Sequence, residues 1–280
     1  MALYKPSELT AFLESLGIAP KKGLSQNFLI DGNIIRNIIA AANLEAGDSV
    51  LEVGPGPGAL TEALLKAHAH VVAVEMDKTL AEALNRLPHE PGQLKVIQQD
   101  ILKTPWSSIS PQLTNPVKLI ANLPYHITTP VLEKFVPMRK EIESIVVMVQ
   151  DEVGKRMAAE AGTKDFGSLS IFLSFYAKVE YQFKVGRRCF FPAPKVDSAV
   201  VKLTLRPTPE GIDANQFFTL TRTAFQQRRK SLRASLKELY SPTQIEEALA
   251  QLDLQPLTRP EELSLELWCE LCRKLTDKTV

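Results

Sequence analysis

Residues 122–125, in the order Asn-Leu-Pro-Tyr, combine a side-chain amide, a proline carbonyl and an aromatic ring at one turn. The side-chain oxygen of Asn122 and the carbonyl of Pro124 can both accept hydrogen bonds from an exocyclic amino group. Because proline lacks an N–H and fixes the turn, its carbonyl points outward. Holding both amine protons directs the nitrogen lone pair at an electrophile such as an activated methyl group. Tyr125 supplies a stacking face for a base. The alternative is an ordinary strand-to-helix loop.

A glycine-rich turn follows another apolar run, and residues 52–58 read Glu-Val-Gly-Pro-Gly-Pro-Gly. Glycines such as Gly54 and Gly56 let the backbone bend tightly and approach a ligand closely. The spacing is G-x-G-x-G, whereas dinucleotide-binding folds use G-x-G-x-x-G around a pyrophosphate. The pattern therefore favours a ligand without pyrophosphate, such as an adenosyl-amino acid.

Two acidic residues end the next two apolar runs. Glu75 follows Gly54 by 21 residues, and Asp100 follows the run 94–98. An acid at the first position binds ribose hydroxyls in open α/β sheets, and a carboxylate at the second can accept from an adenine amino group. All these groups fall at carboxyl ends of expected strands, where ligands of this fold class bind. The alternative is a structural turn with two solvated acids.

The loop 189–198 is extended and stiffened by proline, and it carries Phe190 and Phe191. These rings can form the second wall of an adenine slot. Aromatic residues that precede a strand more often belong to the core.

These motifs need a sheet to bring them together, and the chain has apolar runs that alternate with helical patterns. Runs that are apolar throughout and separated by helices indicate a parallel sheet covered on both faces. The last two runs lie closer together, so we expect an antiparallel edge. The expected strands are 49–53, 70–75, 94–98, 117–121, 144–150, 179–185 and 198–205.

Helical patterns flank the expected sheet. A short helix is expected at 7–16, and Asp31 can cap a helix that runs to about Asn43. After the linker 207–211 only helical patterns follow, at 215–239, from Ser241 with a capping box, and near 260–275. We therefore expect an N-terminal arm (1–30), an α/β domain (31–207) and a small all-helical C-terminal domain (208–280).

The expected helix 215–239 is basic. Between Leu220 and Tyr240 six Lys/Arg stand against one acid, although the net charge of the whole chain is +1. On a helical wheel four of them share one face, which predicts contact with RNA phosphates. They are Arg222, Arg229, Arg233 and Lys237. A solvated basic face is the alternative.

Composition excludes several classes of protein. Hydrophobic residues make up 45% of the chain and charged residues 23%, as in ordinary globular proteins. No apolar run is long enough for a bilayer, and no secretory signal is visible. The three cysteines do not suggest a disulfide framework, and Cys269-x-x-Cys272 lacks a second ligand pair for zinc. We expect a cytoplasmic protein without a metal.

Taken together, the motifs resemble the ribosomal RNA adenine N6,N6-dimethyltransferases of the KsgA/RsmA type over nearly the whole chain. The resemblance extends to Gln-Asn-Phe-Leu at 26–29, to 190–198 and to 224–233. It implies a class I methyltransferase domain with a Rossmann-like, mostly parallel seven-stranded sheet. It also implies dimethylation of two adjacent adenosines in the 3′-terminal hairpin of small-subunit (16S) rRNA, on an assembly intermediate, by a protein that we expect to be monomeric.

The resemblance also assigns roles to residues. The cofactor would be S-adenosyl-L-methionine. Its contacts would be Asn27, Leu29, Gly54, Gly56, Glu75, Asp100 and Asn122. Asn122, Pro124 and Tyr125 would hold the target adenine, and Phe190 would stack on it. Ser25 stands where the family usually has glycine, and serine disfavours φ > 0, so the resemblance does not fix the path of the arm.

Four other functions share parts of this pattern. Erm resistance methyltransferases modify large-subunit rRNA and share the cofactor motifs. A non-catalytic assembly factor would not need Glu75, Asp100, Asn122 and Tyr125 together. A small-molecule methyltransferase would not explain the helical C-terminal part, and DNA adenine methyltransferases usually have aspartate at the position of Asn122.

Overall fold

The computed structural model describes residues 3–20, 26–227 and 230–276. The chain forms two compact units, one of residues 1–154 with 180–205 and one of residues 155–179 with 206–280. This division differs from the boundaries expected above in two respects. The N-terminal arm belongs to the same unit as the sheet, and the segment 155–179 belongs with the C-terminal helices.

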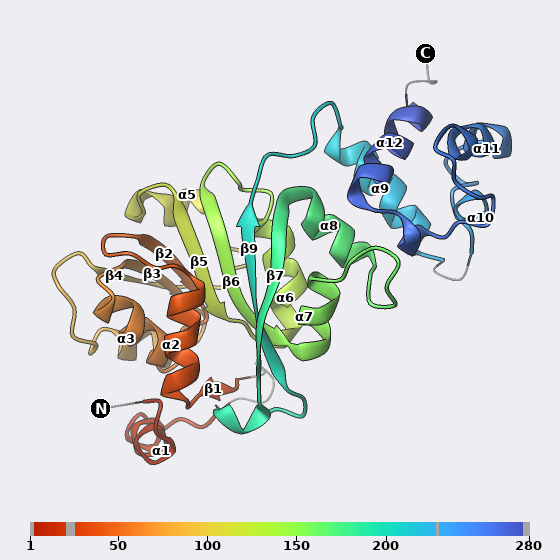
Figure 1. The fold of residues 1–280 in the computed structure, drawn as a ribbon. Helices are drawn as coiled ribbons and strands as arrows, with labels where there is room; N and C mark the ends of the chain where they lie inside the picture. The colour runs from red at the N-terminus through yellow and green to blue at the C-terminus, as the bar shows by residue number, and fades with distance from the viewer. Residues whose placement is uncertain (1–2, 21–25, 228–229, 277–280) are drawn as a thin grey trace. The chain divides into compact units, whose positions relative to one another are not determined.

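Helices and strands alternate through the first unit, and the second unit is helical (Figure 1). The strands are β1 (Phe28–Leu29), β2 (Ser49–Val53), β3 (His70–Glu75), β4 (Leu94–Gln98), β5 (Val117–Asn122), β6 (Ile142–Gln150), β7 (Ala177–Val185), β8 (Phe190–Phe191) and β9 (Ser198–Leu205). The helices are α1 (Pro6–Ser15), α2 (Gly32–Ala41), α3 (Ala59–Lys66), α4 (Lys78–Leu84), α5 (Trp106–Ile109), α6 (Thr128–Phe135), α7 (Asp151–Met157), α8 (Ser168–Tyr176), α9 (Ala214–Phe225), α10 (Leu232–Ser235), α11 (Pro242–Gln251) and α12 (Leu265–Thr276).

Seven strands form the main sheet in the order β4-β3-β2-β5-β6-β9-β7. β2 pairs in parallel with β3 and β5, β3 with β4, and β5 with β6, whereas β9 is antiparallel to β6. The expected mostly parallel seven-stranded sheet is therefore confirmed, and so is the antiparallel strand near its edge. All seven expected strands form, and the differences in their ends do not exceed two residues.

Apolar side chains on both faces hold this sheet in place. All five residues of β2 are buried. On one face, Val50, Val71 and Ile120 pack with Ile35 and Ile38 of α2, and this cluster also includes Leu60 and Leu64 of α3. α6 lies behind the sheet in the view of Figure 1, and its Phe135 is fully buried. As expected, Asp31 caps α2, because its side chain accepts from the amides of Asn33 and Ile34.

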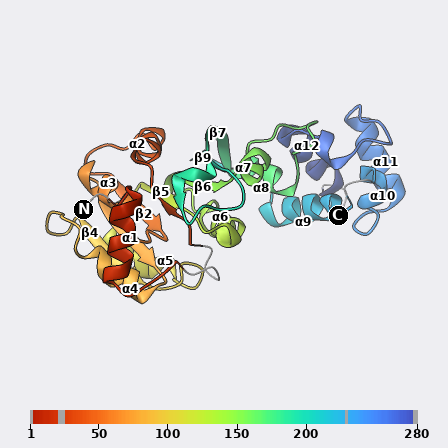
Figure 2. The ribbon, with the colours of Figure 1, turned by 90° about the horizontal axis from the view of Figure 1, so that it is seen from below.

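The N-terminal arm folds against the carboxyl edge of the sheet. β1 pairs with β8 in a separate two-stranded antiparallel sheet, with Phe28 opposite Phe191 and Leu29 opposite Phe190. Leu9 and Leu13 of α1 pack against Phe28 and Leu80, and Figure 2 shows α1 beside α4. The sequence motifs at 26–29 and 190–198 lie far apart along the chain, and this pairing brings them together in one small sheet.

The second unit packs helices around aromatic side chains. Phe175 of α8 lies 4.7 Å from Phe217 of α9 between ring centroids, and Trp268 of α12 is fully buried. Ser241 forms the expected capping box with Gln244 at the start of α11. The single helix expected over 215–239 is wrong, because α9 ends at Phe225 and the short α10 begins only at Leu232.

The glycine turn 54–58 generates a stability prediction. A Cβ on Gly58, where φ is +94°, would lie 2.7 Å from Leu84 Cδ2 and 3.0 Å from Leu87 Cδ1. We expect Gly58→Ala to lower the free energy of unfolding by about 1–3 kcal/mol more than Gly92→Ala, because only the first overpacks the core. Gly92 also has a positive φ, of +81°, but a Cβ there meets nothing within 4 Å.

Urea unfolding of both variants measures the difference in their free energies of unfolding. Both variants carry the backbone strain of a positive φ, so the difference reports the overpacking alone. Equal losses would contradict the packing explanation.

Candidate functional site

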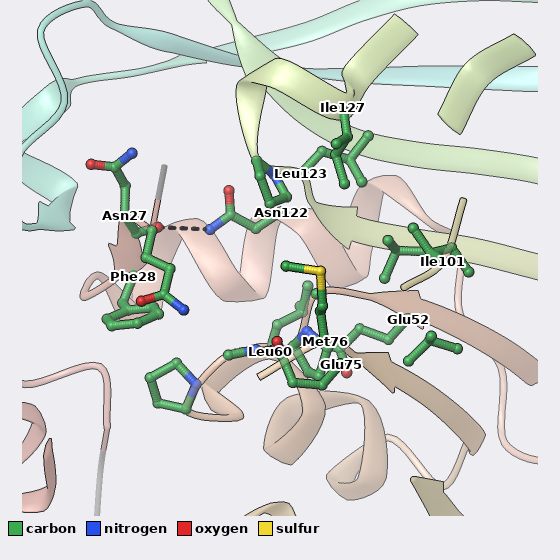
Figure 3. A pocket seen from close by; sticks show the side chains of 18 of the residues that line it. Asn27, Phe28, Glu52, Leu60, Glu75, Met76, Ile101, Asn122, Leu123 and Ile127 are labelled. Carbon is green, nitrogen blue, oxygen red and sulfur yellow. Dashed lines mark hydrogen bonds between the residues drawn. The ribbon is translucent and has the colours of Figure 1, made fainter. Parts of the chain in front are cut away.

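The expected ligand-binding groups converge on one cavity at the carboxyl edge of the sheet. Gly54 follows β2, Glu75 ends β3, Asp100 follows β4, and Asn122 ends β5. The cavity has a volume of about 330 Å³ and is shown in Figure 3. Its size lies in the range of small-ligand sites. Its walls include Asn27, Leu29, Gly54, Gly56, Glu75, Asp100, Asn122, Pro124 and Tyr125, together with Leu3 and Leu9 of the arm.

The glycine turn and Glu75 hold each other in position. Gly54 and Gly56 have φ values of +66° and +57°, which favour glycine. The Gly56 amide donates to Glu75 Oε2 and the Asp77 amide to Glu75 Oε1, each at 2.9 Å. Burial raises the pKa of the Glu75 carboxyl, although the amides of Asp77 and Gly56 lower it. The carboxyl is thus oriented before any ligand binds.

Asp100 begins a loop that is fixed from two sides. Its Oδ1 accepts from the Leu102 amide at 2.9 Å. Lys134 of α6 donates its ammonium hydrogens to the carbonyls of Ile101, Leu102 and Thr104 at 2.6, 3.3 and 2.6 Å. Lys134 could not be predicted from the sequence, because nothing in its neighbourhood along the chain marks it as a partner of residues about thirty positions earlier.

The Asn-Leu-Pro-Tyr corner lies opposite the arm. Asn122 Nδ2 donates to the Asn27 carbonyl at 3.2 Å (Figure 3), so the side-chain oxygen is the group that can accept from a ligand. The Pro124 carbonyl accepts from the Ile127 amide at 3.0 Å and has a second lone pair for another donor. Tyr125 Oη lies 2.8 Å from Ser198 Oγ, and this contact holds the ring at the cavity wall.

Phe190 is not part of this cavity. Its side chain is only 3% exposed and packs in the core with Leu29 and Val185. In this structure Phe190 therefore presents no face to the cavity, and its stacking on the base stays a prediction. Of the two aromatic residues expected to contact the base, Tyr125 alone lines the cavity.

The four residues of the expected basic stripe do not share one helix. Arg222 is exposed on α9, and Arg233 of α10 forms an ion pair with Glu246 at 2.6 Å. Lys237 is exposed beyond the end of α10. Arg229 lies outside the described residues, as does Ser25 of the arm. The expected common face assumed one continuous helix, and this helix ends at Phe225.

Glu52 is a second residue that sequence analysis did not assign to the site. It lies on β2, lines the cavity and is 1% exposed. Burial raises the pKa of its carboxyl to about 8, and the Glu75 charge adds to this effect, against a lowering by the Thr61 hydroxyl. A sequence signal existed, because Glu52 is the only charged residue in the apolar run 49–53.

The charges of the cavity are mostly acidic. Glu52, Glu75 and Asp100 all line it, and among the described residues no lysine or arginine does. The residues present therefore fit a cationic ligand that also carries hydroxyl and amino groups. No helix in the described ranges is long and apolar enough to span a bilayer.

Sequence comparisons identify the family to which this chain belongs. The sequence model of the family described as ribosomal RNA adenine dimethylase matches residues 19–277. A relative from Protochlamydia amoebophila, named ribosomal RNA small subunit methyltransferase A, is 53% identical over 98% of both chains. A protein of the same name from Chlamydia caviae is 48% identical over 99% of both chains.

Two solved structures share the fold. One is a dimethyladenosine transferase from Plasmodium falciparum, with a TM-score of 0.79 and 25% identity over 90% of this chain and 98% of that one. The other is the 23S rRNA methyltransferase ErmE, with a TM-score of 0.71 and 28% identity over 89% of this chain and 99% of that one. The expected resemblance is confirmed, and so is the class I methyltransferase architecture.

Lys134 generates a prediction about the loop after Asp100. In Lys134→Met three backbone carbonyls lose a charged hydrogen-bond donor. We therefore expect the Leu102 and Thr104 amides to exchange with solvent about tenfold faster, which corresponds to a decrease of about 1.4 kcal/mol in the free energy of local opening. Native-state hydrogen exchange measures this.

Lys103→Met is the control, because that lysine is exposed and lies 3.9 Å from Asp100. If both variants exchanged at the wild-type rate, Lys134 would not be fixing the loop.

Proposed function

Because the chain belongs to the ribosomal RNA adenine dimethylase family, we propose that it dimethylates N6 of two adjacent adenosines in the 3′-terminal hairpin of small-subunit rRNA. The convergence of Asn122, Pro124 and Tyr125 with Glu75 and Asp100 in one cavity carries this proposal. The name of the relatives at 48–53% identity supports the small subunit as the source of the substrate.

The cavity fits S-adenosyl-L-methionine, which when bound supplies an electrophilic methyl group. Glu75 accepts from the ribose hydroxyls, and the two amides on its oxygens keep it in position. Asp100 accepts from the adenine amino group of the cofactor. Asn27, Leu29, Gly54, Gly56 and Asn122 complete the contacts, and the glycines allow the ligand to approach the backbone.

The target amine is held by two acceptors. The Asn122 side-chain oxygen and the second lone pair of the Pro124 carbonyl accept hydrogen bonds from the two N6 hydrogens of the unmethylated amine. This directs the nitrogen lone pair at the methyl group, so the rate gain comes from orientation. Direct transfer then requires neither a metal nor a covalent enzyme intermediate. The amine gives up one proton to solvent for each methyl group that it gains.

Tyr125 stacks on the target base, which leaves its helix to enter the cavity. Ser198 fixes the Tyr125 hydroxyl, so the ring is oriented beforehand at little cost in entropy. Tyr125 lines the cavity whereas Phe190 is buried, which supports the assignment of this role to Tyr125. We further propose that the substrate is rRNA in a ribosomal assembly intermediate, and that the enzyme is a cytoplasmic monomer.

Asn122→Ala tests the site. We expect about 10²–10³-fold slower methyl transfer, because one of two acceptors for the amine is lost. The assay uses labelled S-adenosylmethionine and small ribosomal subunits from cells that lack the modification, followed by nucleoside analysis. Asn85→Ala, at an exposed position, is the control and should retain wild-type activity.

The products separate the alternatives. Label in N6,N6-dimethyladenosine of small-subunit RNA, lost in Asn122→Ala, supports the proposal. Label only in large-subunit RNA would instead indicate the activity that ErmE is named for. An absence of label in both would identify a binding protein without methyl transfer.

The basic residues of the second unit generate a prediction about RNA affinity. We propose that Arg222, Arg233, Lys237 and Arg229 contact RNA phosphates. Replacing both Arg222 and Lys237 by glutamine should then lower the slope of log affinity against log salt by about two, one for each lost phosphate contact. Lys66→Gln on α3, where Lys66 pairs with Glu62 at 2.6 Å, is the control. An unchanged slope in the double variant would show that these residues do not contact RNA phosphates and form a solvated basic surface.

A further inference from the structure

The guanidinium group of Arg86 joins the N-terminal arm to the glycine turn. Arg86 lies just beyond the end of α4, and its Cζ is 3.9 Å from the ring centroid of Phe12 in α1. Its Nη2 donates to the Pro57 carbonyl of the glycine turn at 2.7 Å, and its Nη1 donates to the Ala83 carbonyl. A planar guanidinium can make these contacts together, because its face stacks on a ring while its N–H groups donate in the plane.

The helix that Arg86 contacts supplies one wall of the cavity. Leu9 of α1 and Leu3 just before it line the cavity, and both are almost fully buried. Leu9 and Leu13 pack with Phe28 and Leu80, and α1 lies beside α4 in Figure 2. The position of α1 therefore determines where the two leucines of the cavity wall lie.

The glycine turn is held from two sides. On one side the Gly56 amide donates to Glu75, and on the other the Pro57 carbonyl accepts from Arg86. The ring of Phe28 lies against the same turn, because a Cβ on Gly56 would be 3.1 Å from two of its atoms. The arm therefore meets the turn through an apolar contact at Phe28 and through the charged hydrogen bond of Arg86.

We infer that Arg86 is a positioning residue for ligand binding, which holds α1 against the glycine turn so that the wall formed by Leu3 and Leu9 is in place before a ligand enters. Arg86 does not line the cavity itself, so it acts through Phe12 and Pro57. This inference rests on the proposed function, because the ligand whose binding it favours is an S-adenosyl compound.

A wall that is fixed in advance raises affinity without touching the ligand. If the wall had to be ordered during binding, the ordering would cost free energy, and prior order removes this cost. The apparent affinity falls in proportion to the fraction of molecules in which the arm is in place. A bound ligand itself favours the complete wall. Loss of the Arg86 contacts should therefore raise KM for the cofactor and leave kcat at saturating cofactor unchanged.

Arg86→Met tests the inference, because methionine keeps an apolar chain and loses the charge and the donors. We expect S-adenosylhomocysteine to bind about tenfold more weakly in calorimetry, and KM for S-adenosylmethionine to rise by a similar factor at unchanged kcat. Without ligand, the amides of α1 should exchange with solvent about tenfold faster. One such amide is that of Leu9, which donates to the Lys5 carbonyl at 2.9 Å.

Two further variants separate positioning from a general loss of stability. Arg86→Lys keeps a cation that can lie over Phe12 and a donor for Pro57, so it should recover most of the affinity. Phe12→Leu removes the ring and should weaken binding in the same direction as Arg86→Met. Combining the two changes should add little to the loss, because both break the same contact.

Arg273→Met is the matched control. Arg273 of α12 also donates to a backbone carbonyl, that of Glu210 at 2.8 Å, but it belongs to the second unit. This variant should bind S-adenosylhomocysteine as the wild type does, even where its thermal stability is lower.

The outcomes separate this inference from the proposed function. Wild-type affinity in Arg86→Met, a lower kcat at unchanged KM, or α1 amides that exchange at the wild-type rate would each overturn the positioning role and leave the proposed function intact. Fully additive losses in the double variant would show that Arg86 does not act through Phe12, and would also overturn it. Failure of S-adenosylhomocysteine to bind the wild type would overturn the proposed cofactor, and this inference with it.

Discussion

The parallel pairing of β2 with β3 and β5 is the constraint on which the site depends. Because these ladders run in register, the carboxyl ends of the strands reach one edge together, and the groups that follow them face one cavity. The Gly54 amide extends the ladder by donating to the Val74 carbonyl at 3.0 Å, so the glycine turn starts from a fixed point. A slip of one residue in β2 would reverse its side chains and remove Glu52 from the cavity edge.

The cavity shows how a fold prepares for a charged ligand. Three acidic residues line it, and Glu75 and Glu52 are almost fully withdrawn from water. Glu75 is compensated by two backbone amides, whereas Glu52 has an unsatisfied oxygen. Burying such carboxyls costs free energy and so lowers the stability of the protein, and a cation bound beside them would offset this cost. Function and stability therefore oppose each other at the end of β2.

Much of this arrangement could be predicted from the sequence, because its main signals are local. The runs 49–53, 70–75 and 94–98 matched β2, β3 and β4 since buried parallel strands are apolar throughout. What failed depended on distant partners. The pairing of β1 with β8 and the burial of Phe190 arise from contacts between the two ends of the first unit. The break after Phe225 overrides a helical pattern that continues in the sequence.

The small sheet of β1 and β8 joins residues that are far apart along the chain, with Phe28 opposite Phe191. The wall of the cavity that carries Asn27 and Leu29 is held by this pairing, and the strands of the sheet from β2 to β7 are encoded between its two halves. During synthesis the arm emerges early, but β1 has no strand partner until β8 leaves the ribosome. The wall of the cavity that β1 carries is therefore completed late, when most of the first unit has been made.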